Sequence, residues 1–201
     1  VCSVAESQGA RVLRLDITHD DRDPDSYAVD LTDLEATRAC IEGLGPFDGL
    51  VNLAGGFAIG SDSWVDVDDD WDQMFRLNVT TLRNAIKAAV PVLLHGSGGS
   101  IVNVGAYGAR EGQGLMGAYC ASKSVVMRLT ESLAEELKTK GINVNAVLPT
   151  IIDTPANRTA MPDADSATWV APEDLASVIC FLLSPAARAV HGALVPVRGL
   201  I

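Results

Sequence analysis

Tyr119 and Lys123 are the residue pair in this sequence whose types and spacing could carry out acid–base chemistry. They lie four positions apart in GAYCASK (117–123), so on a helix their side chains share one face. A phenol has an unperturbed pKa of about 10, which is too high for proton transfer at neutral pH. A neighbouring ammonium group favours the phenolate and lowers that pKa. We therefore expect Lys123 to make Tyr119 a usable acid or base.

Other polar and small residues follow apolar runs, where a ligand would sit in an open α/β sheet. Asp16 ends one run, and its carboxylate could bind a ribose diol or be a simple loop carboxylate. The glycines of NLAGG (52–56) allow close approach to a flat ligand, although a tight turn would look the same. Asn78 lies inside a long helical segment, where a short amide needs a partner. The stretch LPTIIDTP (148–155) follows a further run.

The elements that position these residues alternate between short apolar runs and longer helical patterns. The runs predict strands at 10–15, 49–54, 100–104, 142–148 and 193–197. The patterns predict helices at 31–45, 68–90, 118–141 and 172–184. We expect a doubly wound parallel α/β sheet of the Rossmann-like kind, in one domain over residues 1–201.

Four residues predict where helices begin and end. Thr32 and Glu35 have capping-box spacing, and Pro172 suits a first helical position. Pro91 is expected to kink the end of the second helix, and Gly141 to cap the third.

The first residues are a special case. Residues 1–16 have the pattern of the last turns of a helix, a cap at Gly9 and then a strand. Because such a helix follows a strand in a doubly wound sheet, we expect the first strand and its glycine-rich phosphate loop upstream of Val1 in the natural protein.

Composition limits the partners. The 201 residues carry a formal charge of −11, which argues against nucleic acid and anionic membranes. No apolar run approaches the roughly 20 residues of a membrane span. The four cysteines and three histidines are scattered, which favours free thiols in a reducing cytoplasm and no metal site.

Seven stretches together resemble the short-chain dehydrogenase/reductase family over nearly the whole chain. They are AVDLTD (28–33), NLAGG (52–56), WDQMFRLNVTT (71–81), GGSIVNV (98–104), GAYCASK (117–123), GINVNAVLPTIIDTP (141–155) and HGALVPVRG (191–199). The resemblance implies an NAD(P)-dependent oxidoreductase acting on a small molecule. It also implies a homodimer or homotetramer that associates through helices at about 68–95 and 118–140.

The resemblance assigns roles to individual residues. It makes Tyr119, Lys123 and Asn78 the catalytic set. The residues that it places around the cofactor are Asp16, Asp30, Leu31, Asn52, Ala54, Gly55, Val104, Tyr119, Lys123, Pro149, Ile152 and Thr154. Of these, Asp30 and Leu31 would flank the adenine. Asp16 would favour NADH, because its carboxylate would repel the additional phosphate of NADPH.

One departure from the family pattern guides the choice of substrate. The family's catalytic serine lies thirteen residues before the tyrosine, where this chain has Ala106 after Gly105. Dihydropteridine reductase-like members of the family are similar here, and also in LAGGFAIG (53–60) and in 148–175. They imply hydride transfer from NADH to a quinonoid dihydropteridine. Gly105 and Ala106 would leave room for that flat ring, and Phe57, or less well Trp64, would stack on it.

Two other interpretations remain open at this stage. One is a carbonyl reductase or alcohol dehydrogenase in which Tyr107 or a water replaces the serine. The other is a non-catalytic nucleotide-binding protein, against which the retention of Asn78, Tyr119 and Lys123 argues.

Overall fold

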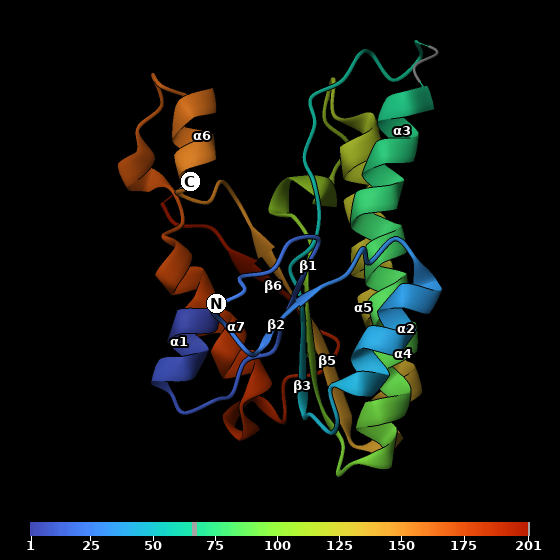
Figure 1. Ribbon diagram of the computed structural model, residues 1–201. Helices are drawn as coiled ribbons and strands as arrows, with labels where there is room; N and C mark the ends of the chain where they lie inside the picture. Colours follow the sequence, from blue (N-terminus) through green and yellow to red (C-terminus); the bar gives the residue numbers. More distant parts are fainter. Residues whose placement is uncertain (66–67, 201) are drawn as a thin grey trace.

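The computed structural model (Figure 1) describes residues 1–65 and 68–200 and contains the expected parallel α/β architecture. Two sheets are formed, and every strand pair in them is parallel. The smaller sheet pairs β1 (Arg14–Asp16) with β2 (Ser26–Ala28). The larger sheet has the order β3-β4-β5-β6, with bounds Gly49–Asn52, Gly99–Val104, Ile142–Pro149 and Leu194–Val197.

Helices cover both faces of the sheets. Figure 1 shows α2, α4 and α5 on one side and α1 and α7 on the other. The helix bounds are α1 Cys2–Ser7, α2 Leu34–Gly43, α3 Asp68–Phe75, α4 Thr81–His95, α5 Gly117–Leu137, α6 Pro155–Ala160 and α7 Pro172–Leu183. A π-helical turn, η1 (Arg76–Thr80), joins α3 to α4. Short 3-10 turns lie at Tyr107–Arg110 (η2), Lys138–Lys140 (η3), Ser166–Thr168 (η4) and Pro185–Ala187 (η5). No helix among these described residues is long and apolar enough to span a membrane.

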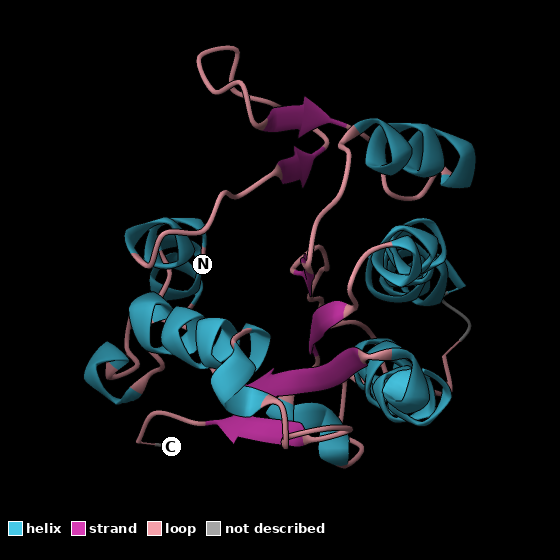
Figure 2. Ribbon diagram, turned by 90° about the horizontal axis from the view of Figure 1, so that it is seen from below, coloured by secondary structure: helices cyan, strands magenta, loops and turns pink. Residues whose placement is uncertain are grey.

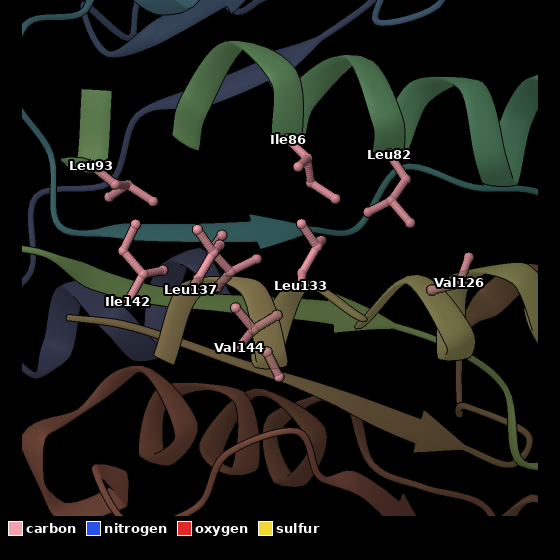
Figure 3. Packing of buried hydrophobic residues seen from close by; sticks show 10 residues of the cluster. Leu82, Ile86, Leu93, Val126, Leu133, Leu137, Ile142 and Val144 are labelled. Carbon is pink, nitrogen blue, oxygen red and sulfur yellow. The ribbon is translucent and has the colours of Figure 1, made fainter. Parts of the chain in front are cut away.

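The main core lies between the larger sheet and the pair α4 and α5 (Figure 3). Leu82, Ile86 and Leu93 of α4 meet an apolar stripe of α5 over Ile142 and Val144 of β5. That stripe is the one the sequence predicts, with Val126, Leu133 and Leu137 buried and Leu129 partly buried. The burial of this face fixes the rotation of α5, and therefore the direction in which Tyr119 and Lys123 point.

Helix ends agree with the sequence only in part. Gly141 adopts a left-handed conformation (φ 73°) after α5 and η3, and Pro172 begins α7, both as predicted. The cap of α2 is Asp33 and not Thr32, because the Asp33 carboxylate accepts hydrogen bonds from the amides of Glu35 and Ala36. The second helix does not end near Pro91 but continues to His95.

The small sheet is the least expected part of the fold. Strand β2 is only three residues long and was not predicted, and β1 is shorter than the run 10–15 suggests. Nine residues (17–25) connect the two strands without a helix, although parallel crossovers usually need a dozen or more. Ion pairs hold this short connection, including Arg11 with Asp25 at 2.6 Å and Arg14 with Asp23 at 2.6 Å.

A cavity of about 1500 Å³ separates the two sheets. Leu15 and Val29 line it on the side of the small sheet, and Leu50 and Val51 line it on the side of the larger one. In Figure 2 the ribbons of β1 and β2 lie well apart from β3. Among the described residues no hydrogen-bonded strand pair joins the two sheets.

Candidate functional site

The predicted site residues end neighbouring strands. Asp16 ends β1, Asn52 ends β3, Val104 ends β4 and Pro149 ends β5. Because all strand pairs are parallel, the residues of each sheet lie at its carboxyl edge. Six of the expected cofactor residues line the large cavity, namely Asp16, Asp30, Leu31, Asn52, Ala54 and Gly55.

Asn78 lies in η1 and binds the glycine segment after β3. Its side chain is 2% exposed, its Oδ1 accepts from Gly56 N at 2.9 Å, and its Nδ2 donates to Gly56 O at 3.0 Å. Nδ2 also donates to Ser122 Oγ at 3.0 Å. These partners explain an amide inside a helix, as the sequence required. A Cβ at Gly55 would lie 2.6 Å from Asn78 Oδ1, so this glycine is needed for close approach to Asn78.

Lys123 is buried on α5 next to this segment. Its Nζ donates to the Val104 carbonyl at 2.9 Å, and a Cβ at Gly55 would lie 3.3 Å from Nζ. Burial lowers the pKa of Lys123 from its ordinary value to about 8, because an ammonium loses hydration there. Among residues 1–65 and 68–200, no carboxylate pairs with it. The buried amine of Lys123 therefore lies beside Asn78 and Gly55.

Tyr119 lies one turn before Lys123 on α5, and its ring meets Phe57 edge to face with centroids 4.9 Å apart. Burial raises the pKa of Tyr119 to about 12, with a smaller contribution from Cys120. The expectation that Lys123 lowers the pKa of Tyr119 is therefore wrong for the protein without cofactor. Desolvation dominates here, and Tyr119 is protonated at neutral pH.

Ala106 and Gly105 are both packed into the interior. Ala106 is 5% exposed and belongs to a small apolar cluster with Cys120, Met127 and Leu148, against which Tyr119 also packs. A Cβ at Gly105 would lie 2.5 Å from Leu148 Cδ2. The expectation that Gly105 leaves room for a substrate ring is wrong on that side, because Leu148 fills the space. At position 106, the methyl group offers no hydrogen-bond donor beside Tyr119.

The aromatic residues near the site differ in burial. Phe57 is 58% exposed and contacts Tyr119, so its ring is accessible beside the phenol. Trp64, the weaker stacking candidate, is 84% exposed. Trp169, in the segment after β5, is 7% exposed.

The nucleotide side is held mainly by bonds between exposed groups. Asp16 is exposed, and its Oδ1 accepts weakly from Thr18 N at 3.4 Å. Asp30 accepts from the amide and hydroxyl of Thr32, which lowers the pKa of its carboxyl group. One buried contact reaches this side, because Asn84 Nδ2 donates to Leu31 O at 2.9 Å and to Thr32 O.

The residues after β5 form hydrogen bonds within their own segment. Thr154 caps α6 by accepting from Asn157 N, and Asn157 Nδ2 donates to Ile152 O at 2.8 Å. Pro149 is buried at the end of β5, and Ile152 packs on the cluster beneath α7. None of these three predicted cofactor residues lines the large cavity.

The structure adds residues that the sequence analysis missed. Ser122 is fully buried and connects Asn78 to the Tyr119 carbonyl, to which its hydroxyl donates at 2.8 Å. Asn103 accepts from Asn52 at 2.8 Å and donates to Thr130 at 2.9 Å. The sequence could have indicated Ser122, because it is a polar residue between Tyr119 and Lys123 on the buried face of α5.

The described residues fit a nicotinamide dinucleotide. Two carboxylates suited to hydroxyl groups, Asp16 and Asp30, lie on the wall of the cavity. The glycine-containing segment 52–56 reaches from there to the amine of Lys123. The cavity thus has carboxylates at the carboxyl edge of the strands, and Gly55 on its wall adjoins Asn78 and Lys123.

Comparison with known proteins agrees with this assignment. Residues 2–165 match the family model described as short chain dehydrogenase. A relative named inactive 2-(S)-hydroxypropyl-CoM dehydrogenase 2, from Xanthobacter autotrophicus, is 37% identical over 85% of this chain and 81% of its own. L-xylulose reductase from Bos taurus is 30% identical over 99% of this chain and 89% of its own.

Solved structures show the same fold. Ligand-free aldohexose dehydrogenase from Thermoplasma acidophilum has a TM-score of 0.87 at 26% identity, covering 99% of this chain and 88% of its own. Carveol dehydrogenase from Mycobacterium avium, in complex with NAD, has a TM-score of 0.77 at 31% identity, covering 87% and 73%. ElxO with NADP bound has a TM-score of 0.80 at 25% identity, covering 87% and 76%. Structural neighbours of this chain therefore include complexes with either nicotinamide cofactor.

Proposed function

Because the chain belongs to the short-chain dehydrogenase/reductase family, we propose that it transfers a hydride from NADH to a small conjugated acceptor, in the first place a quinonoid dihydropteridine. The family makes it an NAD(P)-dependent oxidoreductase. The acceptor and the preference for NADH are our inference from the site.

The proposal rests on one observation. The site contains a candidate proton donor, Tyr119, but position 106 provides no donor for an oxyanion. We assign catalytic roles to Tyr119, Lys123 and Asn78, whereas position 106 has a methyl group in the same cluster as Tyr119. Reduction of a ketone builds charge on an oxygen that enzymes stabilise with preorganised donors. Reduction of a quinonoid ring adds hydrogen to a conjugated imine system and builds no alkoxide. The methyl group is therefore compatible with this acceptor and unfavourable for a ketone.

The chain's own residues supply the proton and the positioning. NADH, when bound, supplies the hydride and its electron pair, which form the new bond to the acceptor. Tyr119, whose pKa burial holds at about 12, donates the accompanying proton, so the O–H bond breaks as an N–H bond forms on the acceptor. Lys123 would bind the hydroxyl groups of the nicotinamide ribose, and Asn78 holds Gly56 in place beside it.

The preference for NADH rests on the charges around Asp16. The connection 17–25 contributes four further carboxylates, those of Asp20, Asp21, Asp23 and Asp25. The nearby arginines are already paired with acidic residues: Arg14 with Asp23 and Glu6, and Arg22 with Asp20 at 2.8 Å. A phosphate on the adenosine ribose would meet a carboxylate and no unpaired cation among these residues.

A carbonyl reductase or alcohol dehydrogenase is the second candidate. Tyr107 directly follows Ala106 and packs on the same cluster as Tyr119, so its hydroxyl is the nearest replacement for the serine along the chain. Named relatives include L-xylulose reductase and a 2-(S)-hydroxypropyl-CoM dehydrogenase from Xanthobacter autotrophicus, 33% identical over 86% of this chain and 72% of its own.

An assay of NADH oxidation distinguishes the candidates. Chemically generated quinonoid dihydropteridine and simple ketones are compared as acceptors, with the wild-type protein and the Ala106→Ser variant. We expect turnover of the pteridine by the wild type, little turnover of ketones, and a gain on ketones in Ala106→Ser. Turnover of ketones above that of the pteridine by the wild type would establish the second candidate. No turnover of any acceptor, with NADH binding retained, would leave a nucleotide-binding protein.

We also propose that the protein is a homodimer or homotetramer associating through α4 and α5. Size-exclusion chromatography with light scattering tests this, and a monomer at all concentrations would contradict it.

A further inference from the structure

A small pocket lies beside the phenol of Tyr119. The loop 58–65, the helix α3 and the segment 115–119 form its walls, and its volume is about 20 Å³. We propose that Asp70 is a specificity-determining residue that accepts a hydrogen bond from an amino or amidino group of the acceptor. The inference rests on the proposed hydride transfer and adds the chemical class of its acceptor. The polar side chains in the walls are those of Ser61, Asp62, Ser63 and Asp70, besides Tyr119.

The walls of this pocket favour hydrogen-bond donors as ligands. Among the described residues that line it, two have carboxylates and none is a lysine, arginine or histidine. A carboxylate accepts hydrogen bonds and cannot donate them, whereas an N–H group donates. A hydrogen bond between the two is charge-assisted and stronger than one between neutral groups. A carbonyl oxygen or an anionic group at the same place would instead be repelled.

Asp70 is placed differently from its neighbours on α3. It is partly buried and lines the pocket, whereas Asp69 and Asp72 are exposed and do not line it. Its Oδ2 lies against the opposite wall, because a Cβ at Gly60 would be 2.6 Å from this atom. Within residues 1–65 and 68–200, no cation pairs with the Asp70 carboxylate and no group donates a hydrogen bond to it. The described residues therefore leave its acceptor capacity to a ligand.

The opposite wall is held to the start of α5. Gly60 N donates to the Leu115 carbonyl at 2.9 Å, and Leu115 has a left-handed backbone (φ 62°) that is unusual for leucine. A Cβ at Gly117 would overlap Ser63 Oγ, so the loop packs closely on the first residue of α5. Tyr119 lies two residues further along the same helix. These contacts therefore hold the pocket next to the phenol.

The size of the pocket limits what can enter it. About 20 Å³ is room for one group of the size of a water molecule. An amino group has that size, whereas a pteridine ring does not fit. The ring would stay outside, against the exposed side chains of Trp71 and Leu115, which line the pocket, and of Phe57, which contacts Tyr119. A quinonoid dihydropterin meets both conditions, because its pyrimidine ring carries a 2-amino group.

The test compares two ligands that differ at one position. A tetrahydropterin, the product of the proposed reaction, has a 2-amino group where the corresponding tetrahydrolumazine has a 2-oxo group. Anaerobic calorimetry in the presence of NAD measures the binding of each, and the wild type should bind the tetrahydropterin more tightly. Asp70→Asn, whose amide can also donate to the oxo group, should reduce that preference roughly 10-fold or more, in the range for a hydrogen bond to a charged group. Asp69→Asn is the matched control, since this carboxylate is exposed on the same helix.

Steady-state kinetics separates this subsite from the proposed function. With the matching quinonoid dihydro compounds, the preference should appear in kcat/KM, and Asp70→Asn should alter KM more than kcat. Equal affinity of the wild type for the two ligands, no binding of either, or an equal loss in Asp69→Asn would overturn the subsite, and the first two results need no variant. If no acceptor is turned over but the tetrahydropterin still binds more tightly, the proposed function fails and the subsite stands. Turnover of both compounds with equal kcat/KM would retain the function and remove the subsite.

Discussion

The catalytic side and the nucleotide side of this cleft are held by different kinds of interaction. On the catalytic side, Asn78 and Lys123 are 2% and 7% exposed and bind backbone atoms of Gly56 and Val104. On the nucleotide side, Asp16 is exposed at the end of a three-residue strand, and ion pairs on the surface hold the connection after it. The residues proposed for chemistry are thus fixed by the core, and those proposed for cofactor choice are not.

This difference sets how substitutions on the two sides should behave. A buried polar group that loses its partner costs about 1–3 kcal/mol, because water cannot replace the partner. An exposed ion pair contributes about 0–1 kcal/mol. We therefore expect large, coupled losses of activity and stability on the catalytic side. On the nucleotide side, we expect changes of cofactor preference with little change of stability.

The largest effect is expected from Tyr119→Phe. The variant keeps the ring that packs on Phe57 and removes the proton donor, so the free energy of unfolding should change little. Positioned acid catalysis contributes typically 10²–10⁴-fold, and kcat/KM with the proposed acceptor should fall by about that factor. Tyr27→Phe, on β2, is the control. Full activity of Tyr119→Phe would remove this residue from the mechanism.

The second effect is a dependence of stability on pH that comes from Lys123. Burial lowers its pKa from 10.5 to about 8, so between these values the unfolded state binds more protons than the folded state. The free energy of unfolding should therefore rise as the pH increases from about 8 to about 10, by on the order of 3 kcal/mol at most. Above pH 10 the raised pKa of Tyr119 acts in the opposite direction.

Denaturant unfolding of Lys123→Met across this pH range checks that prediction. The slope that Lys123 contributes should disappear in this variant and persist in Lys87→Met, whose exposed lysine lies on α4. An identical slope in all three proteins would show that Lys123 is not desolvated.

The third comparison uses two buried asparagines. Asn78→Ala removes the bonds to Gly56, and Asn84→Ala removes the bonds to Leu31 and Thr32. Each should lower the free energy of unfolding by about 1–3 kcal/mol. Because they hold different sides, Asn78→Ala should mainly lower kcat, and Asn84→Ala should mainly raise KM for NADH. The same kinetic change in both variants would contradict the division between the two sides.

The parts of the structure that the sequence could predict follow the same division between the catalytic side and the nucleotide side. The strands of the larger sheet are continuous apolar runs, and the stripe Val126–Leu133–Leu137 fixes how α5 packs, so the larger sheet and the face shared by Tyr119 and Lys123 could be predicted. Strand β2 is three residues long, too short for any periodicity to show. The assignment of Pro149, Ile152 and Thr154 to the cofactor stays a prediction.

The remaining differences have specific physical causes. Thr32 and Asp33 are both residue types that cap helices well. Asp33 caps α2, whereas Thr32 donates its hydroxyl to Asp30, and local spacing does not reveal which of the two is the cap. The pKa of Tyr119 is set mainly by the burial of its side chain, which the sequence does not reveal. The contact of Arg198 with Tyr107 joins residues far apart in the chain, and only the fold brings them together.

The smallest effect, and the one that best isolates the nucleotide side, is expected from Asp16→Ser. Wild-type protein should have the higher kcat/KM with NADH, because the Asp16 carboxylate repels a phosphate on the adenosine ribose. Removing one charge at an exposed site should shift the ratio of NADPH to NADH efficiency by roughly 10-fold toward NADPH, equivalent to about 1.4 kcal/mol. Stability should not change, since the Asp16 side chain has one weak contact. Asp21→Ser, a neighbouring exposed carboxylate, is the control, and a wild-type preference for NADPH would show that Asp16 does not set the choice of cofactor.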